Sequence, residues 1–89
     1  MIQKGNTIVY KASDTYTMFF WLCDIQGDDL IFFDWYASPR KASPNDFWRM
    51  STKWFDEKVK EGTLEVYETL PLDMYGDIFE KQAIERNNG

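Results

Sequence analysis

The chain has 89 residues, 44% of them hydrophobic and 18% aromatic, and a formal net charge of -5 at pH 7. A chain of this length buries roughly 60% of its unfolded surface around one core, which excludes a second domain. Non-specific binding to nucleic acids is driven by basic residues, so the acidic balance works against that function. We expect one compact domain over residues 1–86 and a disordered tail over residues 87–89.

The aromatic residues, seven Phe, five Tyr and four Trp, must supply much of the core. Each buried aromatic side chain removes about 150 to 250 Å² from water, so such a core needs no covalent crosslink. Cys23 is the single cysteine and cannot form an intramolecular disulfide; its place in the apolar run 18–23 predicts a buried, structural thiol. We find neither a signal peptide nor a window near the roughly 20 apolar residues of a membrane span, and expect a cytoplasmic protein.

Three β-strands are predicted within the first 36 residues. Residues 7–10 form a short β-prone segment, and residues 15–25 and 30–36 are longer runs of aromatic and β-branched residues. The intervening Gln26-Gly27-Asp28-Asp29 is typical of a turn, so residues 15–36 are predicted to form a β-hairpin. Because the first of its strands is almost continuously hydrophobic, its second face must also be covered or used for binding.

Two prolines, Pro39 and Pro44, interrupt the strand pattern that precedes them. Proline restricts both its own backbone and that of the residue before it, so neither a strand nor a helix can run through this stretch. We expect a loop of defined shape over residues 37–50, with a short turn over residues 46–49 capped by Ser43 or Asn45.

A capped helix is predicted over about residues 52–61. Ser51 precedes it as a helix N-cap, and Gly62 stands where a glycine commonly ends a helix. Phe55 and Val59 are four residues apart and are expected to face the core together.

The remaining residues predict one more strand and one more helix. Residues 63–69 alternate, with Leu64 and Val66 facing inward and Glu65 and Tyr67 facing outward. A helix is expected between Pro71 and residue 86, although Gly76 disfavours it by roughly 1 kcal/mol relative to alanine.

This order of elements predicts an α+β protein with one small, curled antiparallel sheet of about four strands. One packing that fits is an SH3-like barrel closed at one end or face by the first helix. An open sheet with helices on one side is the other packing that fits.

The sequence lacks the usual catalytic and metal-binding constellations. It contains no histidine, which removes the commonest general base and zinc ligand, and a single cysteine cannot form a thiolate metal site. Its five glycines form neither a phosphate-binding loop nor a dinucleotide fingerprint. Asp28 and Asp29 are expected to favour the hairpin turn. We therefore expect no enzyme, no catalytic residues, no metal and no cofactor.

Two segments could bind a partner. In the hairpin, Trp21 and Trp35 belong to aromatic faces that a single thin sheet cannot bury on both sides, so either helices or a partner must cover one face. The loop over residues 38–49 carries cationic, amide and aromatic side chains: Arg40, Lys41, Asn45, Trp48 and Arg49. It could hold a phosphate and stack a base, or it could be an exposed loop whose arginines pair with carboxylates.

Three features resemble the small uncharacterised proteins of large bacteriophages over about 65 residues. They are the opening Lys4-Gly5-Asn6, the aromatic hairpin with its Gly27-Asp28-Asp29 turn, and Met50-Ser51 followed by Phe55, Val59, Gly62, Leu64 and Glu65. Such proteins are often early-expressed inhibitors of host enzymes or of antiviral defence. The resemblance implies a compact α+β fold and a similar function in the host cytoplasm.

We therefore expect a non-enzymatic inhibitor that blocks a host protein by direct binding. A sponge that sequesters a nucleotide immune signal through the loop is one alternative, and an acidic DNA mimic is another, with only a modest negative field. A homo-oligomer is also expected, because the aromatic content is high for so short a chain. A membrane partner and a nucleic-acid partner are not expected.

Overall fold

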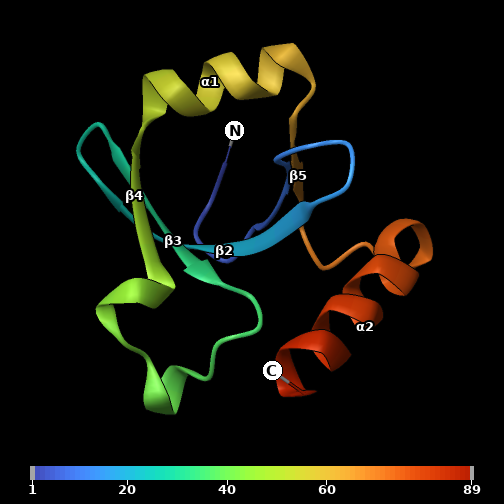
Figure 1. Ribbon diagram of the computed structural model, residues 1–89. Helices are drawn as coiled ribbons and strands as arrows, with labels where there is room; N and C mark the ends of the chain where they lie inside the picture. Colours follow the sequence, from blue (N-terminus) through green and yellow to red (C-terminus); the bar gives the residue numbers. More distant parts are fainter. Residues whose placement is uncertain (1, 89) are drawn as a thin grey trace.

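The computed structural model describes the backbone of residues 2–88 and the side chains of all of these except residues 39, 87 and 88. Over this range the chain is an α+β protein with a five-stranded antiparallel sheet, in the order β4-β3-β2-β1-β5, and two α-helices (Figure 1). The strands are β1 (Thr7–Lys11), β2 (Thr17–Gln26), β3 (Asp29–Asp34), β4 (Phe47–Ser51) and β5 (Leu64–Tyr67), and the helices are α1 (Thr52–Glu61) and α2 (Leu72–Asn88).

The hairpin of β2 and β3 is confirmed and contains a β-bulge at Cys23. Leu22 lies opposite Phe32 but Asp24 lies opposite Ile31, which leaves Cys23 as an extra residue on β2. The prediction of a buried thiol is wrong, because Cys23 is exposed and its Sγ donates to the Ile31 carbonyl oxygen at 3.3 Å. The bulge takes this residue out of the regular alternation that buries Leu22.

Residues 47–51 form the edge strand β4, where the sequence predicted a loop with a short turn. The irregular stretch ends at Asp46, after 3-10 turns at Pro39–Lys41 and Pro44–Asp46. β4 pairs with β3, so that Trp48 lies opposite Phe32. A single run of five residues with a charged residue at its centre is too short for the alternation to be recognised beside two prolines.

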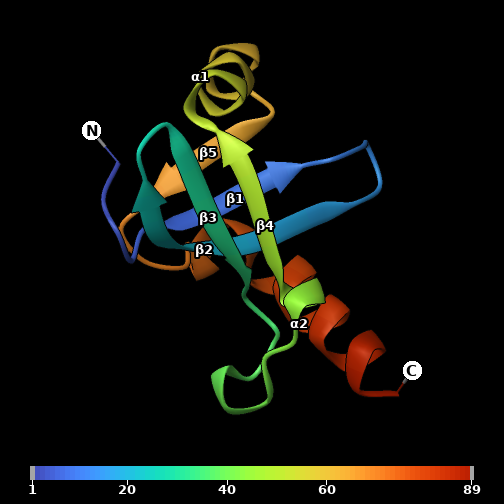
Figure 2. The ribbon, with the colours of Figure 1, turned by 90° about the vertical axis from the view of Figure 1, so that its left-hand side faces the viewer.

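The sheet is strongly curled but does not close. The rings of Trp48 on β4 and Phe20 on β2 have centroids 5.0 Å apart, and Trp48 lines the same pocket as Leu64 of β5. In a flat sheet β4 and β5 would be separated by four strand spacings of about 4.8 Å each. Figure 2 shows β4 crossing in front of the other strands. Within residues 2–88 the two edge strands do not pair, so the predicted SH3-like barrel is not formed.

The two helices cover opposite faces of the sheet, which differs from both predicted packings. On the α1 face, Phe55 stacks on Phe32 with ring centroids 6.2 Å apart. On the α2 face, Phe79 packs edge-on against Phe19 with centroids 5.3 Å apart. Successive side chains of β2 point to opposite faces, so this one strand supplies side chains to the apolar packing under both helices. The buried cluster of the α1 face consists of Ile8, Phe20, Leu22, Leu30, Phe32, Phe55 and Leu64.

Helix α1 has the predicted boundaries and caps. Ser51 Oγ accepts a hydrogen bond from the Trp54 backbone N–H at 3.1 Å, and Gly62 ends the helix at φ 81°. Val59 is 42% exposed, so its predicted place in the core is wrong. Trp54, which precedes Phe55, takes the sheet-facing position instead and packs against Tyr10 with ring centroids 5.6 Å apart.

Helix α2 is longer than predicted. Its backbone includes residues 87 and 88, which the sequence assigned to a disordered tail, whereas residue 89 lies outside the described residues. Neither α2 nor α1 is both long and apolar enough to cross a membrane, and no other helix within residues 2–88 is.

Replacement by alanine is expected to have opposite effects at Gly62, which caps the end of α1, and at Gly76, which lies inside α2. Gly62 has φ 81°, so Gly62→Ala is expected to lower the free energy of unfolding by about 1 kcal/mol. At Gly76 an added Cβ would meet the Leu72 Cβ at 3.8 Å, which is an ordinary contact. Gly76→Ala is therefore expected to raise the free energy of unfolding by about 0.5 to 1 kcal/mol. Urea denaturation measures both, and equal effects of the two substitutions would contradict the assignment of their backbones.

Candidate functional site

The residues predicted to bind a partner lie in three separate places. Trp21 and Trp35 pack together on the α2 face, with ring centroids 4.4 Å apart. Among the described residues, neither buried indole N–H has a hydrogen-bond partner. The hairpin tryptophans are thus a packed aromatic pair.

The predicted loop residues do not converge on one site. Arg40, Lys41 and Asn45 are exposed in the stretch before β4, which projects away from the sheet in Figure 2. Trp48 and Arg49 are neighbours in β4 and therefore point to opposite faces. Trp48 enters the α1 face, whereas Arg49 binds the Asp29 carboxylate at 3.0 Å and the Gln26 side-chain oxygen at 2.8 Å.

One polar cluster centres on the Glu65 carboxylate. It accepts hydrogen bonds from Lys11 Nζ at 2.9 Å, Tyr67 Oη at 2.8 Å and Tyr75 Oη at 2.6 Å. Burial by itself raises the pKa of Glu65, but these three hydrogen bonds outweigh it and hold the pKa below its ordinary value. Because Tyr75 belongs to α2 and the other residues to the sheet, the cluster ties the start of α2 to the sheet.

A second polar cluster holds the other end of α2. Asp34 is only 6% exposed, and its carboxylate accepts hydrogen bonds from Arg86 Nη1 at 2.8 Å and from the Tyr36 backbone N–H at 2.9 Å. The Arg86 guanidinium also lies over the Tyr36 ring, 4.9 Å from its centroid. The Tyr36 hydroxyl donates to Gln82 Oε1 at 3.1 Å, and burial raises its pKa. The carboxylates of Glu65 and Asp34 thus both hold α2 against the sheet.

No three His, Cys, Asp or Glu side chains are close enough to hold a metal ion within the part of the chain that the structure describes. The polar contact of the Cys23 thiol is with the Ile31 carbonyl oxygen. Partial burial raises the pKa of its thiol, which favours the less nucleophilic protonated form.

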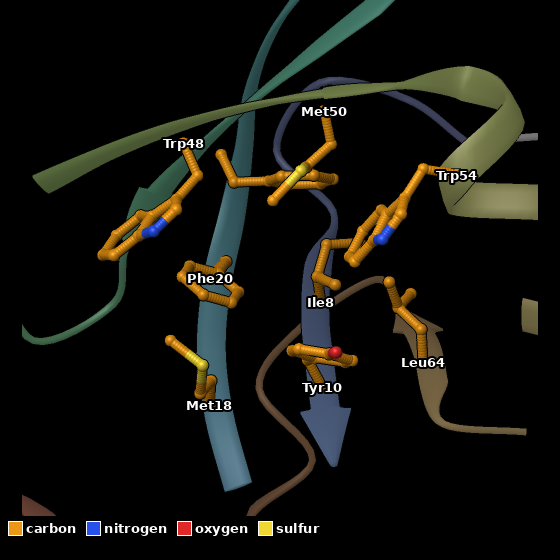
Figure 3. A pocket seen from close by; sticks show the side chains of 9 residues that line it. Ile8, Tyr10, Met18, Phe20, Trp48, Met50, Trp54 and Leu64 are labelled. Carbon is orange, nitrogen blue, oxygen red and sulfur yellow. The ribbon is translucent and has the colours of Figure 1, made fainter. Parts of the chain in front are cut away.

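The best-formed candidate site is an apolar groove on the α1 face, with a volume of about 50 Å³ (Figure 3). Trp48 and Met50 of β4 stand over the strands β1 and β2, Trp54 of α1 lies towards one end, and Met18 lies towards the other. We call this site the groove; its lining residues are Ile8, Tyr10, Met18, Phe20, Phe32, Trp48, Met50, Trp54 and Leu64.

The groove exists because α1 covers only part of a curled aromatic sheet. Five of its large side chains are only half-buried: Tyr10, Met18, Trp48, Met50 and Trp54. Of these five, only Trp48 was among the residues that the sequence predicted to bind a partner. The alternation of Trp48 and Met50 was the signal for Met50, but recognising it required the strand β4 to be predicted.

A second apolar surface lies beyond α2 on the opposite face. Phe47 is 42% exposed there, and it borders a shallow hollow of about 210 Å³ together with Trp21, Cys23, Phe33 and Ala42. This hollow is wider and flatter than the groove, so it offers a bound side chain fewer walls.

Comparison with known proteins gives no match, because no protein-family model, no curated protein sequence and no solved structure is similar to this chain.

The Glu65 cluster predicts acid-sensitive stability. A carboxyl group with a lowered pKa in the folded state stabilises the fold above its ordinary pKa of 4.5, and that contribution is lost as pH falls through the lower folded-state value. Glu65→Gln is expected to lower the free energy of unfolding at pH 7 by about 1 to 3 kcal/mol, with a smaller difference from the wild type at pH 3.

Glu61→Gln is the matched control, because Glu61 is an exposed carboxylate that pairs with Lys58 at 3.3 Å. This substitution is expected to change stability by no more than about 0.5 kcal/mol at either pH. Urea denaturation at pH 7 and pH 3 measures both variants. A Glu65 effect that is the same at the two pH values would refute the carboxylate's role in docking α2.

Proposed function

We propose that this protein is a non-enzymatic inhibitor that blocks a host protein by direct binding, and that the groove is its binding surface. The observation that carries the proposal is that Trp48, Met50 and Trp54 line an open, wholly apolar groove while remaining half-buried. Aromatic and methionine side chains in apolar recesses are typical of the residues that dominate binding energy at protein interfaces.

The size of the groove favours a protein side chain as the bound group. Its volume of about 50 Å³ is about a third of the roughly 150 Å³ cavity that accommodates benzene. The end of an aliphatic side chain presented by a partner can enter such a space, whereas a nucleotide cannot. The resemblance to small bacteriophage proteins favours a bacterial partner and an action in the host cytoplasm.

The two alternative functions have less support. A nucleotide sponge would need Trp48 and Arg49 beside one ligand, and these side chains lie on opposite faces of β4. An acidic DNA mimic would need a continuous row of carboxylates, but the outer surface of α1 mixes three lysines with three acidic residues.

A capture experiment with three matched substitutions tests the proposal. The immobilised chain is incubated with bacterial lysate, and bound proteins are quantified by mass spectrometry. Met18→Glu places a charge in the groove and is expected to reduce the recovered partner at least tenfold. Met74→Glu, at a methionine 60% exposed on α2, and Phe47→Glu, on the opposite face, are expected to leave recovery unchanged.

A captured partner must then be inhibited by the purified chain at a one-to-one ratio, and Met18→Glu must relieve that inhibition. Recovery that depends on Phe47 and not on Met18 would move the binding surface to the opposite face. Failure to recover any stoichiometric partner would count against the proposed function itself.

A further inference from the structure

The outer edge of β4 carries unused main-chain groups. The Thr52 N–H donates to the Asp28 carbonyl oxygen at 2.8 Å, and hydrogen-bonded pairs alternate along an antiparallel ladder. Trp48 and Met50 therefore direct their main-chain groups to β3, whereas Arg49 directs its N–H and C=O away from the sheet. Among the described residues, no further partner contacts these two groups.

We propose that this edge binds an extended segment of the partner protein, which adds to β4 as a sixth, antiparallel strand and carries the pattern apolar-acidic-apolar. The proposal rests on the proposed function and specifies its binding mode. Addition of a strand to an open sheet edge derives affinity from main-chain hydrogen bonds and specificity from alternating side chains.

The pattern follows from the alternation of faces along β4. A residue opposite Arg49 shares its face and lies beside its guanidinium group. The two residues that flank it lie opposite Trp48 and Met50, and their side chains therefore point towards the groove. Because the groove is lined by apolar side chains alone, it favours aliphatic residues at these positions.

Arg49 can accommodate an acidic residue although it already has partners. A guanidinium group has five N–H donors, and the contacts to Asp29 and Gln26 occupy Nη1 and Nη2 with one hydrogen bond each. Donors therefore remain for a carboxylate on the added strand.

The charge of the surrounding segment favours an acidic partner. Residues 38–54 contain four basic residues and one acidic residue, a net charge of +3. Because the whole chain carries -5, the rest of the chain carries -8. The basic residues are Arg40, Lys41, Arg49 and Lys53, and the acidic one is Asp46. The segment that contains the edge is thus net basic on an acidic protein, although Arg49 alone of these residues lies on the edge and already pairs with Asp29. This balance attracts an acidic segment.

The same charge works against a second copy as the occupant. Pairing of two β4 edges would bring two segments of +3 together, with Arg49 close to its own copy. The other edge strand, β5, contains Leu64-Glu65-Val66, but the Lys11 N–H donates to the Thr63 carbonyl oxygen at 2.7 Å. By alternation Glu65 then also directs its main chain towards β1, so its carboxylate cannot lie opposite Arg49 in a hydrogen-bonded pair.

The test uses synthetic heptapeptides as probes. One has leucine, glutamate and leucine between two threonines on each side, and the other has lysine in place of glutamate. The glutamate peptide is expected to bind at least tenfold more tightly, by isothermal titration calorimetry, and to weaken in 0.5 M NaCl because its charge contact is exposed. In nitrogen-15 NMR spectra, the Arg49 amide should gain protection from hydrogen exchange. Equal binding of the two peptides, or an unprotected Arg49 amide, overturns the proposal.

Two substitutions at one position separate the main-chain contact from the charge. Arg49→Pro removes the outward N–H but leaves the ladder to β3, as proline is tolerated on edge strands. This variant is expected to lose at least tenfold in affinity for both peptides. Arg49→Gln keeps the N–H and is expected to lose only the preference for glutamate. If Arg49→Pro fails to fold, the Arg49 amide protection in the wild type decides the matter.

The Arg49→Pro variant also separates this inference from the proposed function in the lysate capture experiment. Loss of the partner in both Met18→Glu and Arg49→Pro supports strand addition at the groove. Loss in Met18→Glu alone leaves the groove as the binding surface and refutes strand addition. Capture of the chain's own copy, or dimerisation by native mass spectrometry that Arg49→Pro abolishes, would replace the partner segment with a second copy.

Discussion

The aromatic and apolar side chains of β2 point alternately to both faces of a single sheet, and this arrangement constrains the rest of the molecule. Phe20 and Leu22 are buried on one face, and Phe19 is buried on the other. A sheet of one layer cannot shield both faces from water, so each needs a covering element. The chain supplies one helix per face. Each covers only part of its face, which leaves the groove and the hollow around Phe47 as apolar surface.

The curl of the sheet turns one uncovered region into a groove. Strands twist because of backbone sterics, and short edge strands allow the sheet to wrap without closing. β4 has five residues and β5 has four, and the two approach the same groove from opposite sides without pairing. The open edge of β4 and the groove therefore both exist because the curled sheet does not close between β4 and β5. A strand added at that edge would continue the curl and cover the groove, which links the proposed binding mode to the fold.

Helix α2 is held by directional polar contacts as well as by packing. Its apolar contact with the sheet centres on Phe79, whereas Ile84 is 60% exposed. Carboxylates on the sheet compensate for this limited burial. Glu65 binds the first part of the helix and Asp34 binds the last, each through charge-assisted hydrogen bonds. These two acidic groups thus position a helix against the sheet.

The sequence by itself determined the α+β class, the hairpin, both helices and the caps of α1, because these depend on local periodicity, turn residues and capping chemistry. The tertiary structure alone decided that residues 47–51 form a strand, that Val59 faces solvent, and that Cys23 sits in a bulge. It also separated Trp48 from Arg49 and joined Trp48 with Met18 and Trp54. Strand pairing and sheet curl bring together residues distant in sequence, and their geometry depends on the whole sheet and not on any one segment.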